Sequence, residues 1–445
     1  MNRVKSIILV LLLQTSFFSF LTVAGEPFVY GPISPSAFKQ IKVDEHGITV
    51  VVDDGQIVTY NLDHSRSLQW LIKDSFNISI VDTVITENSI YILHLITGGN
   101  HLTAVSKYSR TNGTLLWRKT VDDFPGQGIH LVVNEDINSL VVAGMHEQMI
   151  QVWWYDTGGI FQAHWGKDLA IFTGPLGSEN ELIYAIKLLD DKSVISLSIT
   201  FQENIVRVIH TDIAGNELFD YSHQAHDIVT HGTPPSLLEA NNNQFVITFI
   251  DENLLGVPRF VQFSLDSDGN LLFSNHSDNN TFTGISRPIN LLLNNDSIQN
   301  IYTLSESINI EVQLFQTDEN GQNSQKFSYS YLGVGSFGAI RHAILTDHNS
   351  LFTIATIRPP FPDPFSNTLY LQWTADGLLC NQEEVDGISG LDSSSENILQ
   401  AYQQNIYELR TIKDSITGVN FLHVVKHLNI SECLSDFIFS ASFEN

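Results

Sequence analysis

The chain has 445 residues, of which 43% are hydrophobic and 16% are charged, a composition typical of a globular protein rather than a disordered one. Its 22 basic and 49 acidic residues give a net charge of −27, and no cluster of Lys and Arg interrupts this acidic excess. The charge therefore argues against a nucleic-acid partner and against anionic lipid surfaces as binding sites.

The N-terminus has the pattern of a secretory signal peptide. Arg3 and Lys5 precede an apolar stretch over residues 7–21, and small residues follow at 22–24. We expect cleavage after Ala24, which leaves 22 − 2 = 20 basic and 49 acidic residues, a net charge of −29. The alternative is an uncleaved membrane anchor, but the apolar stretch is short for a membrane span. The mature protein is predicted to be secreted, periplasmic or part of the cell envelope, and not inserted in a membrane.

From Asp63 onwards, a unit of alternating apolar strands and polar turns recurs about every fifty residues. The turn glycines are separated by 46, 56, 54, 52 and 56 residues, and they are Gly113, Gly159, Gly215, Gly269, Gly321 and Gly377. This spacing is typical of one β-propeller blade, which consists of four short antiparallel strands. The sequence therefore predicts an all-β protein.

The strands can be placed unit by unit. The first two units begin near Phe38 and Ile78. The third has strands at 129–133, 139–144 and 150–155 before the turn at 156–159. The next four have strands at 182–188, 194–199, 205–210 and 217–221; at 236–239, 245–250, 260–265 and 271–274; at 288–293, 299–304, 310–315 and 325–331; and at 340–345, 351–357, 368–373 and 378–382. With a last unit from Ile388 to His427, the prediction is eight four-stranded blades over residues 25–428, or seven if the weak terminal units merge.

One unit carries a further marker. In residues 102–119 (LTAVSKYSRTNGTLLWRK), Trp117 follows Gly113 by four positions. This segment resembles the repeat of quinoprotein-like propellers of the pyrroloquinoline-quinone type. Later units keep the glycine and place Phe219 or Phe273 at the tryptophan position. The resemblance supports a propeller fold and does not imply one activity, because the family ranges from dehydrogenases to envelope scaffolds.

The C-terminal residues 429–445 depart from the blade pattern. They resemble the short sorting tails of exported proteins in some Gram-negative bacteria, with an Asp-x-Ile-Phe core; the alternative is a strand that completes the ring or a disordered end. The two cysteines, Cys380 and Cys433, predict a disulfide in an exported chain, with two unpaired thiols as the alternative.

Three motifs were weighed as metal or cofactor sites. The first is the group of His223, His226 and His231, which lies near Asp220 and Asp227 and could form a metal or acid–base centre; the sequence favours a solvated loop instead, because His223 and His226 point to opposite faces of a strand. The second, residues 333–338 (GVGSFG), lacks the helix that a dinucleotide site needs, and the third, residues 266–270 (DSDGN), lacks the closing Glu of a calcium loop. The resemblance to quinoproteins implies, for an enzyme of that family, a quinone held against a disulfide of adjacent cysteines, and Cys380 and Cys433 are not adjacent. We therefore expect no cofactor, and we expect no metal.

The remaining signal for function is geometric. In a four-stranded blade, the loops between the second and third strands share one face with the crossovers between blades. The two longest such loops are 251–259 and 358–367. Phe361 and Phe365 in the second are candidate apolar contacts, with Arg259 and Arg358 beside them. We expect a monomeric, non-catalytic propeller that binds a protein or a glycan through this face; the alternative is an envelope or extracellular hydrolase or lyase with a site there.

Overall fold

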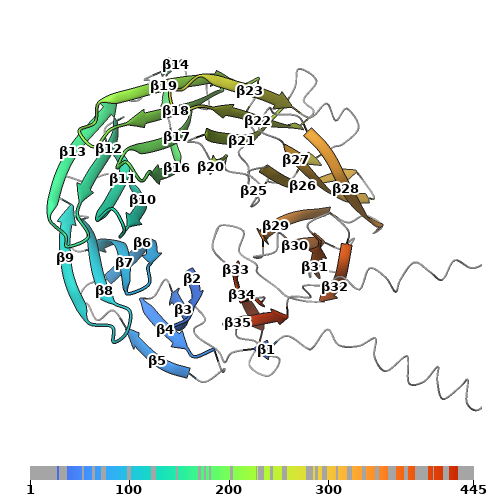
Figure 1. Cartoon of the computed structure of the whole chain (residues 1–445), viewed down its shortest axis with the longest axis horizontal. Coiled ribbons are helices and arrows are strands. Elements are labelled where there is room, and N and C mark those ends of the chain that lie inside the picture. The colour runs from blue at the N-terminus through green and yellow to red at the C-terminus, as the bar shows by residue number, and fades with distance from the viewer. Residues whose placement is uncertain are drawn as a thin grey trace, which may run out of the picture.

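The protein is an all-β β-propeller, as predicted: antiparallel sheets are arranged around a common centre (Figure 1). The computed structural model describes residues 28–428 except for the following segments: 30–37, 53–54, 63–65, 72–76, 98–101, 122–126, 147–148, 169–171, 175–176, 180–181, 201–203, 227, 229–234, 241–243, 253–257, 277–283, 286–288, 293–297, 307–308, 318–322, 333–336, 346–349, 359–366, 375–378, 386–398, 404 and 414–419. The described part contains no helix with the length and hydropathy of a membrane span.

The regular blades have four strands in chain order, from the innermost strand A to the outermost strand D. They are β2 (Phe38–Asp44), β3 (Gly47–Val52), β4 (Gln56–Tyr60) and β5 (Arg66–Leu71); β6 (Asn77–Ile85), β7 (Ser89–Thr97), β8 (Leu102–Ser109) and β9 (Leu115–Val121); β10 (Gln127–Asn134), β11 (Ser139–His146), β12 (Met149–Tyr155) and β13 (Phe161–Asp168); β16 (Leu182–Leu188), β17 (Val194–Thr200), β18 (Ile205–Thr211) and β19 (Glu217–Gln224); β20 (Ser236–Ala240), β21 (Gln244–Glu252), β22 (Pro258–Leu265) and β23 (Leu271–His276); and β29 (Phe337–Leu345), β30 (Leu351–Arg358), β31 (Asn367–Trp373) and β32 (Leu379–Val385).

Three further groups of strands depart from this plan. A separate hairpin consists of β14 (Phe172–Gly174) and β15 (Gly177–Glu179). A five-stranded sheet contains β24 (Gly284–Ile285), β25 (Ile289–Leu292), β26 (Ile298–Glu306), β27 (Asn309–Thr317) and β28 (Asn323–Leu332). The closing sheet joins the two ends of the described chain: β33 (Leu399–Tyr402), β34 (Asn405–Lys413), β35 (Asn420–Leu428) and β1 (Phe28–Val29).

The prediction of eight four-stranded blades needs correction. Among the described strands, seven sheets have four strands, the number given by the alternative, and the remaining large sheet has five. The extra strand arises because β24 and β25 both pair with β26, at Ser305 and Leu304 and then at Ile301 to Ile298. The last unit was also predicted as one consecutive stretch, but its outer strand comes from the N-terminal region, where Phe28 and Val29 pair with β35.

The ring closes through its inner strands. Each inner strand contacts the next one around the ring (Figure 1). The order is β2, β6, β10, β16, β20, β25, β29 and β33, and β33 contacts β2 again. Every sheet of the ring therefore has a neighbour on both sides, so the hydrophobic faces of its strands are covered. This explains why β17 is buried along its whole length although an isolated sheet would bury alternate residues only.

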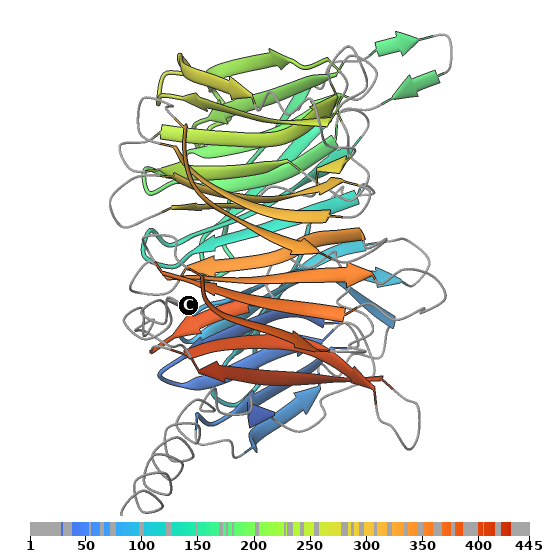
Figure 2. The ribbon, with the colours of Figure 1, turned by 90° about the vertical axis from the view of Figure 1, so that its right-hand side faces the viewer.

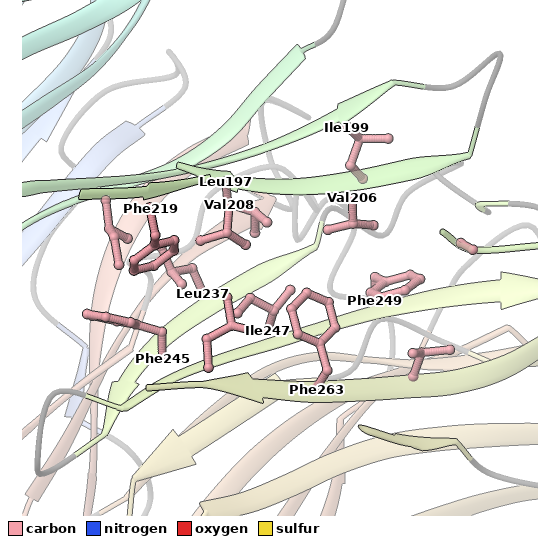
Figure 3. Close-up of a cluster of buried hydrophobic side chains, with 14 of the residues drawn as sticks. Leu197, Ile199, Val206, Val208, Phe219, Leu237, Phe245, Ile247, Phe249 and Phe263 are labelled. Carbon is pink, nitrogen blue, oxygen red and sulfur yellow. The ribbon is translucent and has the colours of Figure 1, made fainter. Parts of the chain in front are cut away.

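The core lies between blades. Figure 3 shows the seam between the β16–β19 and β20–β23 blades, where Leu197 and Val208 lie opposite Ile247 and Phe263. Phe263 is fully buried, and removing a side chain of this size from water contributes roughly 1.5–3 kcal/mol. Burial decreases toward the rim, since the outer strands β19 and β23 alternate between buried and exposed positions.

In three described strand C–strand D turns (C–D turns), a glycine packs against an aromatic ring of the preceding blade. Gly159, Gly215 and Gly269 have φ angles near +80°, a conformation that other residues adopt only under strain. The α-carbon of Gly159 packs on the ring of Trp117 from the previous outer strand, and the indole Nε1 of Trp117 donates a hydrogen bond to the carbonyl of Thr157 at 3.2 Å. The glycine–aromatic spacing in the sequence therefore reflects contact between neighbouring blades, not contact within one blade.

We predict that Gly215→Ala destabilises the fold by roughly 2–4 kcal/mol. A methyl group at Gly215 would lie 2.5 Å from the Cγ atom of Trp165, and the left-handed backbone adds strain of about 1–2 kcal/mol. Gly158→Ala is the matched control, because Gly158 does not have a positive φ and a methyl group there would approach only the Asp156 side chain. Denaturant unfolding of both variants measures the difference; equal stabilities would contradict the proposed packing.

Candidate functional site

The described residues of the predicted binding face centre on an ion pair. Asp251 in β21 lies opposite Arg259 in β22, and the guanidinium Nε and Nη2 atoms donate to its two carboxylate oxygens at 2.5 and 2.8 Å. Only 1% of the Asp251 side chain is exposed, against 28% for Arg259. Residues 251–259 were predicted as one loop; instead, this pair extends the ladder, so that β21 ends at Glu252 and β22 begins at Pro258.

The crossover from β19 to β20 is attached to the same place. The backbone N–H of His226 donates to Asp251 Oδ2 at 3.4 Å, and Ile228 forms an isolated β-bridge with Asp251. Asn204, with φ +53°, supports the crossover from the other side: its Nδ2 atom donates to the His226 carbonyl at 2.9 Å, and its Oδ1 atom accepts from Ile228 N–H at 3.1 Å. These contacts fix the backbone at His226 and Ile228.

His223 sits among aromatic rings beside this pair. Its imidazole stacks on Phe263 with a centroid distance of 4.8 Å and an interplanar angle of 14°, and it meets Phe249 edge-on at 5.8 Å. Burial lowers the pKa of His223 below its usual value; the Asp251 carboxylate opposes this shift and the Arg259 guanidinium adds to it. The ring is therefore neutral at pH 7, and its stacking stabilises the end of β19.

The cluster can anchor a surface more readily than it can move protons. Both oxygens of Asp251 already accept hydrogen bonds from Arg259, so this carboxylate is not available as a general base. Arg259 is partly exposed, and its guanidinium carries a positive charge at the edge of this face. The structure thus places Arg259, His223 and His226 around Asp251. Their hydrogen bonds and ring contacts stabilise the fold at this place.

The other predicted contacts lie at or beyond the edge of the described residues. Arg358 is the last residue of β30, opposite Phe337, and therefore occupies the same end of its blade as Asp251 does in β21. Phe361, Phe365 and His231 lie outside the described residues, so their roles stay predictions. Cys380 lies at the start of β32 and Cys433 lies outside the described residues, so the disulfide also stays a prediction.

The two weaker motifs adopt structures that serve the fold. In the turn at 266–270, Asp266 Oδ1 accepts the backbone N–H groups of Asp268 and Asn270, and Oδ2 accepts the Asn270 side chain at 2.9 Å, so this carboxylate is already occupied. After the glycines of 333–338, residues Phe337–Leu345 form strand β29, where a dinucleotide site would need a helix.

A group of possible metal-ligating side chains, which the sequence did not indicate, lies at the opposite end of the blades. Among the described residues, Glu45, His46 and Glu87 bring one ligand atom each within 4.8 Å of one another. They come from the turns after β2 and β6, and all three are exposed. The Arg110 guanidinium donates to the Glu87 carbonyl at 3.3 Å, and this fixed positive charge nearby opposes a cation.

Sequence reasoning missed Asp251 and Asn204, the two residues that organise the binding face. Asp251 ends a strongly apolar strand, and Arg259 follows eight positions later, as hairpin partners across a short loop would. That spacing could have identified the pair. Asn204 gives no such signal, because its contacts with 225–228 depend on how the crossover bends back over the blade.

No protein-family description and no curated protein matches the chain. Among solved structures, the computationally designed protein Ika8 is similar at 15% identity over 90% of this chain and 99% of its own, with a TM-score of 0.54. BamB from Moraxella catarrhalis matches 82% of this chain and 92% of its own at 11% identity and TM-score 0.42. A quinohemoprotein alcohol dehydrogenase from Comamonas testosteroni matches 88% of this chain and 67% of its own at 10% identity and TM-score 0.35. The likeness to Ika8 shows the fold alone.

We predict that Asp251→Asn lowers the free energy of unfolding by roughly 2–3 kcal/mol. The substitution leaves the Arg259 guanidinium without its charged partner and weakens the attachment of the crossover, but partial exposure of Arg259 moderates the loss. Asp220→Asn, which breaks the ion pair with Arg207 in the β18–β19 hairpin, is the control, and a loss of about 0–1 kcal/mol is expected. Chemical denaturation compares the two; an equal effect would show that Asp251 does not organise the face.

The lowered pKa of His223 leads to a second prediction, which concerns how stability changes with pH. Because the folded chain binds this proton more weakly than the unfolded chain, the associated stability is present above about pH 6.5 and is lost as the pH falls below it. Between about pH 7 and pH 5, stability should therefore decrease less steeply in His223→Gln than in the wild type. A slope in His223→Gln that is parallel to the wild-type slope would refute the assignment.

Proposed function

We propose that the protein is an exported, non-catalytic β-propeller that binds a protein or glycan partner through its crossover face. We define the crossover face by the strand B–strand C loops and the crossovers between blades, with Asp251, Arg259 and Arg358 at its edge. The observation that carries the proposal is that the hairpin β14–β15 is added to the ring in one such crossover, between β13 and β16.

The hairpin extends the surface without disturbing the blades. It pairs only with itself, from Phe172 opposite Glu179 to Gly174 opposite Gly177, and it stands out from the ring at the upper right of Figure 2. A rigid scaffold that carries variable segments at one end is a common way to build a binding surface. The Asp251–Arg259 pair supports the same reading, because it holds a neighbouring loop base in place.

The proline-rich segment between β30 and β31 is the proposed contact region. Arg358 ends β30 at the crossover face, so residues 359–366 connect the strands there. Proline at 359, 360, 362 and 364 limits the conformations of this segment, which reduces the entropy lost on binding. Phe361 and Phe365 provide the apolar contacts and Arg259 and Arg358 the charged ones.

Export and the disulfide belong to the same proposal. The basic start, apolar stretch and small residues before Gly25 support cleavage and release from the cytoplasm. Cys380 begins an outer strand, where the regular blades contact the next C–D turn, and β35 ends at Leu428, five residues before Cys433. This arrangement supports a Cys380–Cys433 disulfide that holds the end of the chain against the ring.

We predict that the double variant Phe361→Ala/Phe365→Ala loses capture of the crossover-face partner while its thermal unfolding is unchanged. The reason is that aromatic side chains commonly dominate the binding energy of an interface, and the proposal assigns these two to the contact with the partner. The measurement is cross-linking mass spectrometry after a pull-down from the native secretome, together with a glycan array. The control Ile160→Ala/Phe161→Ala changes an exposed pair at the start of β13, at the opposite end of the blades, and should keep capture.

Retained capture by the Phe361/Phe365 variant would overturn this assignment. Cross-links that map only to the opposite ends of the blades would do the same, because they would place the partner on the other face.

A further inference from the structure

The other face of the disc is formed by two sets of turns in contact. We call it the turn face; it consists of the strand A–strand B turns (A–B turns) at 44–47, 86–89, 135–138 and 189–193 and the C–D turns at 110–114, 156–160, 212–216 and 266–270. Arg110 of one C–D turn forms an ion pair with Asp44 in the neighbouring blade, and Asn138 accepts the Thr157 N–H at 3.1 Å. These contacts make the turn face one continuous surface.

The exposed large apolar side chains of the described chain all lie on this face. Each is in a C–D turn or at the start of the strand that follows: Leu115, Leu116, Ile160, Phe161, Ile213, Leu218, Leu271, Leu272 and Leu379. The other ends of the same outer strands are polar, for example Asn275 and His276 in β23. An apolar surface confined to one face and repeated from blade to blade marks an interaction site.

A β-bulge accounts for three of these residues in one equivalent position. In β9, β19 and β23 the register of the outer strand shifts by one residue, which leaves Leu116, Leu218 and Leu272 as the extra residues, whereas Gln162 takes this place in β13. Their exposed fractions are 52%, 51% and 50%. The following aromatic residue, such as Phe219 or Phe273, turns inward, and the bulge directs the leucine to water. The fold does not require an apolar residue at such an exposed position.

Acidic side chains share the turn face with these apolar residues. The exposed ones include Asp136 and Asp190 in the A–B turns and Asp268 in a C–D turn. Hydrogen bonds from Asn216 and Asn270 lower the pKa of Asp212 and Asp266, so both remain ionised in mild acid. The described turns contain two Lys or Arg residues, Arg110 and Lys192, and Arg110 is buried and paired with Asp44. The turn face is therefore both apolar and strongly negative.

We propose that the turn face docks a cationic amphipathic segment of a partner protein, with leucine-like side chains over the bulge leucines and Lys or Arg beside the turn carboxylates. Charge complementarity selects this occupant. A second copy of the chain would bring two acidic faces together, because a two-fold interface pairs each patch with itself. The proposal concerns the face opposite the crossover face, so it stands independently of the proposed function.

The test uses the whole mature chain and a synthetic 18-residue amphipathic peptide of Leu and Lys. Calorimetry should show saturable binding that weakens with added salt, since exposed charges are screened. Leu116→Ser/Leu218→Ser/Leu272→Ser should weaken binding at least tenfold with unchanged thermal unfolding, because all three leucines are exposed. Asp136→Asn/Asp268→Asn should weaken binding and flatten its salt dependence.

The matched control removes the same charge from the crossover face. Glu179→Gln/Glu252→Gln changes two acidic residues in β15 and β21 and should bind the peptide as the wild type does, and so should Phe361→Ala/Phe365→Ala. These controls separate the two proposals, because loss of crossover-face capture and loss of peptide binding arise from different variants.

Several results would overturn the proposal. Equal affinity for a Ser–Lys peptide of the same charge would show that the leucines take no part. Wild-type affinity in the triple leucine variant, or weakened binding in the crossover-face controls, would place the peptide elsewhere. Self-association of the wild type in sedimentation, or binding to phosphatidylcholine vesicles, that is lost in the triple variant would replace the cationic partner with a second copy or a lipid surface.

Discussion

The contact between a turn glycine and the aromatic ring of the preceding blade is the constraint on which the ring depends. Gly159, Gly215 and Gly269 adopt positive φ and receive the rings of Trp117, Trp165 and Phe219 within about van der Waals distance of the α-carbon. No sheet here can bury its faces alone, so each blade is stable only in the presence of its neighbours. The aromatic–glycine contact fixes how far one blade is rotated against the next, and aliphatic and aromatic side chains such as those in Figure 3 fill the space between blades.

The sequence predicted the regular blades well because their information is local. Alternation and turn residues placed the strands of the third to fifth units within a few residues, and Phe219 and Phe273 stand four positions after their glycines, as Trp117 does. Trp165 was missed because it stands six positions after Gly159; two residues along a strand return to the same face, so it still reaches Gly215. The pairing of β1 with β35 was not predictable, because a two-residue strand has no period and its partner lies at the other end of the chain. Of the candidate site, Arg259 was predicted, whereas Asp251 was assigned to a loop.

The seam beside the closing sheet differs from the others in chemistry. The buried Glu408 carboxylate accepts a hydrogen bond from Tyr370 of the β29–β32 blade at 3.1 Å and lies 2.7 Å from Nε2 of His427. Phe352 and Tyr370 pack on the same imidazole. Hydrogen bonds to a buried carboxylate are directional, while apolar contacts tolerate sliding, so this network defines the register of β34 and β35. Register is most needed here, because the outer strand of the closing sheet contributes only two residues to the ladder.

The same bulge that makes the ring rigid also makes its two faces different. One residue of the bulge, Phe219 in β19, turns inward under Gly269, and the preceding Leu218 is directed to water. Loss of the bulge would move the aromatic ring out of its contact and the leucine toward the neighbouring strand, because a one-residue shift exchanges the two sides of a strand. The apolar positions of the turn face are thus held by the contacts that hold the blades together. A surface fixed in this way loses little conformational entropy when a partner binds. The crossover face has no equivalent repeat among the described residues, and its shape depends on individual contacts such as the Asp251–Arg259 pair.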